Sequence, residues 1–187
     1  MIWVVWAVAP MRNFRLMGEL FPSTLLKTTA EAPFLVRPLR HDDHLKGYAA
    51  VLAQLTTVGD LDETRFAGRF RAMQETNRRL GTYYCIVVEH VPSRRLVGCA
   101  TLLVEQKFIR ETALCGHVED VVTDKSVRGK GVGRLLTEAL LRLAKEVGCY
   151  KVILDCDEKN VAFYERCGMT AKERQMVIYF PKQTSKL

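Results

Sequence analysis

The chain has 187 residues, of which 48% are hydrophobic and 26% are charged, values typical of a globular protein of one domain. This composition excludes a wholly disordered chain, a collagen-like repeat and a small disulfide-stabilised protein. The formal net charge of +7 suits an anionic ligand, nucleic acid or simple solubility and selects none of them. Because basic and aromatic residues are not interleaved, we expect no nucleic-acid partner.

The six cysteines show no CxxC pair and no metal-ligand spacing, which predicts reduced residues in an intracellular protein. His41 and His44 have no third ligand nearby in the sequence. We therefore expect a solvated loop at this pair and no metal.

The two ends of the chain carry separate signals. Residues 1–10 are apolar but too short to span a bilayer and lack the features of a secretory signal, so we expect no membrane association. Met11 is a second candidate start. The last three residues, Ser185, Lys186 and Leu187, form the address that the peroxisomal import receptor recognises. They predict a peroxisomal or glycosomal protein, which would otherwise be cytoplasmic.

Residues 1–33 contain three prolines and no sustained periodicity, which predicts an irregular extension. The first strand is predicted at residues 34–39. Asp42 or Asp43 can then cap a helix, whose apolar face carries Leu45, Tyr48, Ala49, Leu52 and Leu55. A second amphipathic helix contains Phe66, Phe70 and Met73 and ends before Gly81.

Beyond Gly81 the hydrophobic period becomes that of strands. Residues 82–89 and 96–104 predict a hairpin with a turn at 92–95, and a third strand follows at 113–122. The remaining predicted elements are a helix at 131–147, a strand at 151–156, a helix at 160–167 and a strand at 170–179. This order predicts an α/β protein of the α+β type, with a mixed, mainly antiparallel sheet flanked by helices in a single domain.

The sharpest feature is a glycine-rich loop between a strand and a helix, Arg128-Gly129-Lys130-Gly131-Val132-Gly133. Glycines let backbone N–H groups converge at a helix N-terminus, where they can hold a pyrophosphate with help from nearby cations. ATP and NAD loops fit poorly, because Lys130 is followed by glycine and the third glycine of GxGxxG would fall at Leu136. A plain strand-to-helix turn is the alternative interpretation.

The pattern Arg128-x-x-Gly131-x-Gly133 resembles the (Q/R)xxGx(G/A) loop of the GNAT acetyltransferase superfamily. From about Phe34 to Phe180 the chain resembles its glucosamine-6-phosphate N-acetyltransferases, in the segments 55–59, 116–122, 128–133 and 148–164. The resemblance implies a GNAT domain at residues 34–180, between the extension 1–33 and a tail at 181–187. It also implies acetyl-CoA as co-substrate, no metal, and direct acetyl transfer to the amine of D-glucosamine 6-phosphate, with no acyl-enzyme, on the route to UDP-N-acetylglucosamine.

Acetyl transfer requires a neutral amine, a polarised carbonyl and a proton for the departing thiolate. The resemblance implies that Tyr164 donates this proton, that Asp155 accepts from the amine, and that Glu119 and Asp120 lie at the amine and the sugar hydroxyls. Because neighbours on a strand point to opposite faces, Glu119 and Asp120 should not both act through their side chains. Taken singly, Asp120 and Asp124 could equally be turn or cap residues, and Tyr164 could equally be a core residue.

Two sets of binding residues follow from the resemblance. Acetyl-CoA is expected to contact Val121, Val122, Thr123, Arg128, Gly129, Lys130, Gly131, Val132, Gly133, Asn160 and Tyr164. The sugar phosphate is expected to contact Thr56, Lys107, Arg110, Glu119, Asp120, Tyr150, Lys151 and Asp155.

The sequence departs from the family at its last predicted strand. The family ends this strand with an arginine that reaches the phosphate across a dimer interface, whereas this chain has Tyr179 there. Arg174 or Lys182 could substitute. The resemblance implies a homodimer through this strand, and its apolar residues 177–180 suit an interface.

Three other functions remain open. A GNAT enzyme could act on a protein lysine or a polyamine, and a protein with the glycine-rich loop could bind CoA without catalysis. Cys115 lies two residues from His117, so a cysteine nucleophile is a weaker alternative.

Overall fold

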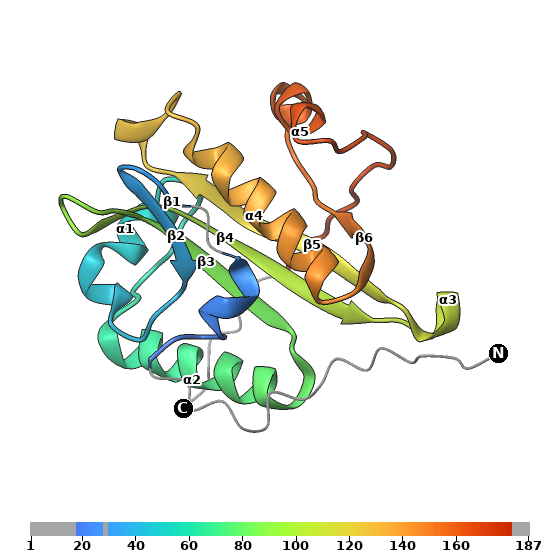
Figure 1. The fold of residues 1–187 in the computed structure, drawn as a ribbon, viewed down its shortest axis with the longest axis horizontal. Coiled ribbons are helices and arrows are strands. Elements are labelled where there is room, and N and C mark those ends of the chain that lie inside the picture. The colour runs from blue at the N-terminus through green and yellow to red at the C-terminus, as the bar shows by residue number, and fades with distance from the viewer. Residues whose placement is uncertain (1–17, 28–29, 181–187) are drawn as a thin grey trace. The chain divides into compact units, whose positions relative to one another are not determined.

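The computed structural model describes residues 18–27 and 30–180. The described residues form two compact units, one that ends at Leu154 and one that begins at Asp155. The first unit contains one six-stranded sheet, in which strands adjacent in sequence are also adjacent in the sheet (Figure 1).

Four of the five pairs of neighbouring strands are antiparallel, and the last pair is parallel. The strands are β1 Ala30–Glu31, β2 Phe34–Pro38, β3 Tyr83–His90, β4 Arg95–Gln106, β5 Leu114–Thr123 and β6 Cys149–Ile153. The parallel pair, β5 and β6, is joined through a helix, as a parallel connection requires. The predicted mixed, mainly antiparallel sheet is confirmed.

The longest helices lie where the sequence periodicity predicts them. The helical segments are η1 Ser23–Leu26, η2 Asp43–Lys46, α1 Tyr48–Leu52, α2 Glu63–Leu80, α3 Ile109–Thr112, η3 Lys125–Val127, α4 Val132–Glu146, η4 Glu158–Asn160 and α5 Val161–Arg166. In the described part of the chain, none of these helices is long and apolar enough to cross a membrane.

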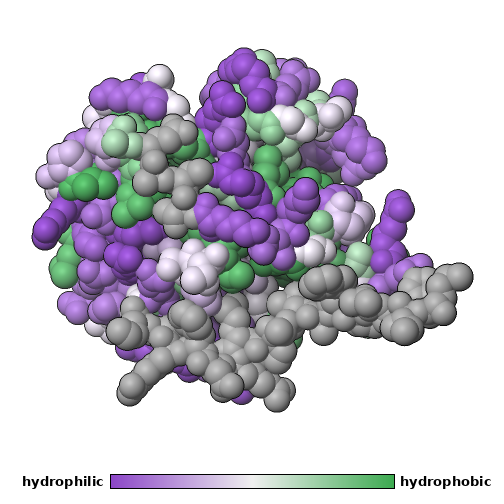
Figure 2. Space-filling view, viewed as in Figure 1, coloured by the Kyte–Doolittle hydropathy of each residue, from purple (hydrophilic) through white to green (hydrophobic). Residues whose placement is uncertain are grey.

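Helix α4 lies across the sheet and supplies much of the core (Figure 1). Eight of its residues are buried. A Cβ on Gly98 of β4 would lie only 3.1 Å from Val132 of α4, so the glycine permits this close approach. The outward side of α4 is charged, with Arg134 and Glu138 paired at 2.6 Å, and hydrophilic residues cover much of the face shown in Figure 2.

Two predicted elements differ from the structure. The helix expected from Asp42 or Asp43 to Leu55 is interrupted at Gly47, whose φ of +92° separates η2 from α1. Leu45, assigned to its apolar face, is 78% exposed. The strand predicted at residues 170–179 is wrong: this segment forms neither a helix nor a strand.

Part of the segment expected to be an irregular extension packs into the core. Leu20 and Phe21 are fully buried, and Phe21 contacts the ring of Tyr84 edge-on at 5.1 Å between centroids. The Asn77 amide donates hydrogen bonds to the carbonyls of Leu20 and Tyr83 at 3.3 and 2.6 Å. The packed part of the chain therefore begins before Phe34. The predictions for residues 1–17 and for the tail 181–187, including Ser185–Leu187, fall outside the described residues.

A buried ion cluster holds η2 against the sheet. The guanidinium of Arg37, on β2, donates to both carboxylate oxygens of Asp43 at 2.7 and 2.8 Å and to Glu89 at 2.6 Å. Burial opposes the charge of Arg37, yet the hydrogen bonds and charges of Asp43 and Glu89 raise its pKa overall. The cluster fixes the point from which α1 starts across the sheet.

Candidate active site

The glycine-rich loop is anchored at its start by Asp124, which follows β5. The Asp124 carboxylate accepts hydrogen bonds from the Ser126 N–H and hydroxyl at 2.8 and 2.6 Å, and from the Gln54 amide at 2.7 Å. These hydrogen bonds, those from Ser126 first, lower the pKa of Asp124. Asp124 is therefore a cap residue, the second of the two roles that the sequence left open for it.

The loop then turns through two glycines in the left-handed region. Gly129 and Gly131 have φ of +78° and +82°, and nothing lies within 4 Å of where a Cβ would stand on either. Gly131 is the N-cap of α4, and no side chain of the described residues caps this end. The start of α4, where the first N–H groups have no partner within the helix, thus lies beside the exposed Arg128 and Lys130, an arrangement that suits an anionic group.

Upstream of the loop, β5 contains a bulge opposite β4. Cys99 pairs with Val122 and Thr101 with Glu119, so two residues of β5 face one residue of β4. Asp120 in this bulge has φ of +53°, an uncommon conformation for a residue other than glycine. Glu119 and Asp120 are both exposed. The argument that they point to opposite faces assumed a regular strand and does not hold here.

A basic cluster forms where β4 ends and where β5 and β6 begin. Lys107 pairs with Glu105 at 2.7 Å, and the hydrogen bond it donates raises its pKa. The Arg110 guanidinium and the Lys151 ammonium lie 5.8 and 5.7 Å from the centroid of the Tyr150 ring, within cation–π range. The structure thus brings together four of the residues predicted to contact the sugar phosphate.

Another residue predicted to contact the sugar phosphate, Thr56, lies away from this cluster in the fold. Thr56 is exposed after α1, and its N–H donates to the carbonyl of Leu52 at 3.3 Å. Thr56 is not a member of the basic cluster.

Three predicted site residues belong to the second unit. Tyr164 is half-buried on α5 and contacts Phe163 edge-on at 4.9 Å between ring centroids. Burial first, and the neighbouring Cys156 and Cys167 second, raise the pKa of Tyr164, so its phenol carries a proton at neutral pH, as a proton donor must. Asp155 and Asn160 are exposed. Contact of these three residues with the glycine-rich loop stays a prediction.

The sequence model of the acetyltransferase (GNAT) family matches residues 51–169. The chain belongs to this family. GNAT acetyltransferases use acetyl-CoA as co-substrate, so the protein is an acyltransferase.

Within the GNAT family, the chain is similar to several proteins that are named for a specific activity. A glucosamine 6-phosphate N-acetyltransferase of Dictyostelium discoideum is 43% identical over 145 residues, which is 78% of this chain and 90% of that protein. The crystal structure of the glucosamine-6-phosphate N-acetyltransferase of Arabidopsis thaliana has a TM-score of 0.76 and 38% identity, and covers 79% of this chain and 99% of its own. An acetyltransferase of Trypanosoma brucei has a TM-score of 0.72 and 36% identity over the same shares. The GNAT fold expected from the sequence is confirmed.

Some residues that the structure places at the GNAT site were not predicted from the sequence. The amide of Gln54 joins α1 to the loop, since its oxygen also accepts from the Lys125 N–H at 2.8 Å. Glu105 binds both Lys107 and His117, the latter at 2.8 Å. Burial raises the pKa of the Cys115 thiol, although the charges of Lys151 and Lys107 oppose that rise. Only the alternation of Cys115 and His117 along one strand hinted at this group in the sequence.

Proposed function

We propose that the protein transfers the acetyl group of acetyl-CoA to the amine of D-glucosamine 6-phosphate, giving N-acetyl-D-glucosamine 6-phosphate and CoA. The observation that carries the proposal is the basic cluster of Lys107, Arg110, Tyr150 and Lys151, which lies where β5 and β6 of a GNAT sheet begin. An arginine fork and lysine ammonium groups are the side chains that bind phosphate oxygens best. The relatives named for this reaction support the same acceptor.

Acetyl-CoA is proposed to lie along β5 and the glycine-rich loop. Its pyrophosphate would lie against the loop from Gly129 to Gly133, with Arg128 and Lys130 beside it. Val121, Val122 and Thr123 would follow the pantetheine arm, which Asn160 would contact from the other side. The thioester would then lie near the bulge at Asp120.

The proposed reaction is a direct transfer. The amine nitrogen attacks the thioester carbonyl, the carbon–sulfur bond breaks, and the thiolate takes the phenolic proton of Tyr164. The amine gives up a proton to a carboxylate, for which Asp155 is proposed, while Glu119 and Asp120 orient the amine and the sugar hydroxyls. No acyl-enzyme forms, so Cys115 is not required as a nucleophile.

The direct test is CoA release by the purified protein, given acetyl-CoA and either glucosamine 6-phosphate or glucosamine. We expect release with the phosphate and much less without it. Arg110→Met should raise KM for the sugar phosphate about 10- to 100-fold, because a hydrogen bond to a charged group contributes about 1.5–3 kcal/mol. Arg71→Met, which changes an exposed arginine of α2, is the matched control and should have no effect.

Two outcomes would contradict the proposal. Equal rates with both sugars would show that phosphate recognition is lost, as the tyrosine at position 179 allows. Acetyl-CoA binding without release to either sugar would overturn the amino-sugar acceptor and favour a protein lysine, a polyamine or a CoA-binding role.

A homodimer is also proposed, through the C-terminal segment. Five consecutive large apolar residues there are exposed by 64% to 92%: Met176, Val177, Ile178, Tyr179 and Phe180. A run of this kind is typical of a surface that meets a partner. A second copy of this chain is the partner we propose.

Import into peroxisomes or glycosomes is proposed from Ser185, Lys186 and Leu187. A fluorescent protein fused to the N-terminus should enter the organelle, whereas the same protein fused after Leu187 should not. Cytoplasmic signal from both fusions would overturn this proposal.

A further inference from the structure

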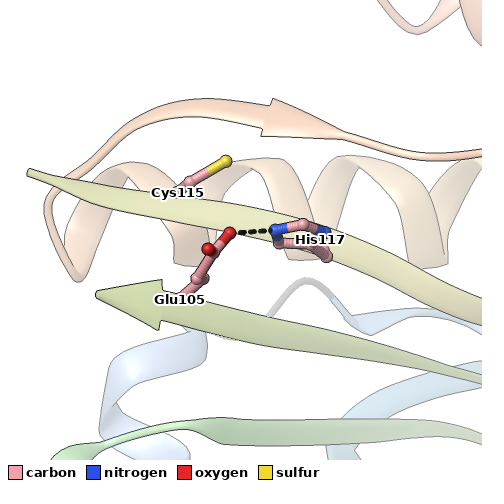
Figure 3. Close-up of side chains that lie close together, drawn as sticks. All are labelled: Glu105, Cys115 and His117. Atoms are coloured by element: carbon pink, nitrogen blue, oxygen red, sulfur yellow. Dashed lines mark hydrogen bonds and ion pairs between the residues drawn. The ribbon is translucent and has the colours of Figure 1, made fainter. Parts of the chain in front are cut away.

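Three side chains with metal-binding atoms meet on β4 and β5. Glu105 comes from β4, and Cys115 and His117 come from β5 (Figure 3). One ligand atom from each lies within 4.8 Å of the other two. Cys115 is fully buried, whereas the side chains of Glu105 and His117 are 40% and 25% exposed. The group is therefore open to solvent at Glu105 and His117 and closed at Cys115.

Strand pairing holds this group in place. Glu105 stands directly opposite Cys115, and His117 stands opposite Leu103, the next position on the same face of β4. Side chains in such direct and diagonal positions lie close enough to share one ion. Because the three positions belong to adjacent paired strands in the sheet, the group does not depend on a loop to form.

We propose that Glu105, Cys115 and His117 form a three-ligand Zn²⁺ site with a fourth, open position. A thiolate, an imidazole and a carboxylate are the donors that zinc takes in proteins. Calcium and magnesium prefer oxygen ligands and are disfavoured by this set. The inference goes beyond the proposed function, in which none of the three residues has a role.

The existing contacts show how the ion would fit. The His117 Nε2 now lies 2.8 Å from Glu105 Oε2, while the Lys107 ammonium occupies the other oxygen, Oε1, at 2.7 Å. Zinc would bind between Nε2 and Oε2, and Lys107 would remain on Oε1 as an outer partner that orients the carboxylate. To reach bond lengths of about 2.0–2.3 Å, the three ligand atoms, which now lie within 4.8 Å of one another, would draw closer by side-chain rotation. The Cys115 thiol releases its proton to solvent as the sulfur–zinc bond forms.

Two positively charged lysines near the proposed site would repel the Zn²⁺ ion and weaken its binding. Lys107 and Lys151 both lie close enough to act on the charge at Cys115, so the affinity should be lower than in a structural zinc site. Lys151→Met removes one of these charges, leaves Lys107 on Glu105, and should tighten metal binding. A surface cation site formed by carboxylates elsewhere on the chain would not respond to this change.

The test is titration of the metal-free full-length protein with Co²⁺, which reports thiolate ligation by its charge-transfer absorption, followed by displacement with Zn²⁺. We expect one equivalent to bind with that absorption. Cys115→Ser should abolish the absorption and weaken Zn²⁺ binding by about 100-fold or more, because even outer partners contribute 10- to 100-fold. Cys156→Ser, which changes an exposed cysteine of the second unit, should change neither.

His117→Gln and Glu105→Gln keep the test decisive if Cys115→Ser fails to fold, since both side chains are partly exposed, and each should weaken binding. Co²⁺ binding without charge-transfer absorption would overturn the proposal, as would unchanged affinity in the three ligand variants. Acetyl-CoA and sugar are absent from this titration, so its failure would leave the proposed acetyl transfer untouched.

Discussion

Tyr164 is the residue on which the proposed proton transfer to sulfur depends. Its raised pKa keeps the phenol protonated at neutral pH. Tyr164→Phe keeps the ring that contacts Phe163 and removes the proton, so we expect kcat to fall by roughly 10²-fold with acetyl-CoA affinity unchanged. Steady-state kinetics and acetyl-CoA titration would measure the two quantities.

The matched control for this prediction is Tyr83→Phe. Tyr83 lies on β3 and its backbone N–H, not its hydroxyl, bonds to Asn77 at 2.7 Å. This variant should keep the wild-type kcat. A Tyr164→Phe protein as fast as the wild type would assign the proton donor elsewhere.

For single residues, the sequence indicates which side chains belong to the site better than it indicates which side chains they contact. Lys107, Arg110, Tyr150 and Lys151 were assigned by resemblance, and the structure brings them together. The left-handed Asp120 was not predictable, because a bulge depends on how β5 aligns with β4. The pair of Glu105 and His117 was missed for the same reason, since their positions become neighbours only through strand register.

Among the elements, the turn that leads into the glycine-rich loop gives the clearest stability prediction. Asp124→Ala removes the acceptor for Ser126 and Gln54 and should lower the free energy of unfolding by about 1 kcal/mol. Urea unfolding would measure the loss. Asp60→Ala, which removes an exposed ion pair with Arg65 at 3.0 Å, should cost far less.

The stability that Asp124 contributes should also depend on pH. The folded state lowers the pKa of Asp124, so its carboxylate stabilises the fold above its unfolded pKa of about 3.9, and this stability is lost as pH falls through the folded pKa. The difference in the free energy of unfolding between wild type and Asp124→Ala should be largest at neutral pH, such as pH 7, and should shrink below about pH 4. A difference that stays constant to acid pH would contradict this role for the charge.

Element boundaries were predictable where one face is buried over many residues. Helices α2 and α4, of 18 and 15 residues, lie within a few residues of their predicted spans because their apolar periodicity is long. The single helix expected across Gly47 was predicted from a short apolar pattern. The left-handed conformation of Gly47 instead divides the segment into η2 and α1. The alternation at 170–179 predicted a strand, but a strand needs a partner for its backbone groups, and the segment is exposed throughout.

At the scale of the whole molecule, the proposed dimer can be tested by one substitution that introduces a charge. Ile178→Asp places a carboxylate in the exposed apolar run of residues 176–180 and should convert a dimer to a monomer, because an interface core excludes unpaired charge. Light scattering after gel filtration would measure the mass. Gln175→Asp, just outside the run, should leave the dimer intact, and a dimer in both variants would place the interface elsewhere.

The buried position of Leu20 and Phe21 also bears on where translation can begin. Met1, Met11 and Met17 all precede these two residues, so ribosomes that start at any of the three would make chains that contain both side chains. A shortened gene that opens at Phe34, where the resemblance to the family begins, would instead delete both side chains. Its product would expose the ring of Tyr84 and leave the Asn77 amide without one of its two carbonyl partners.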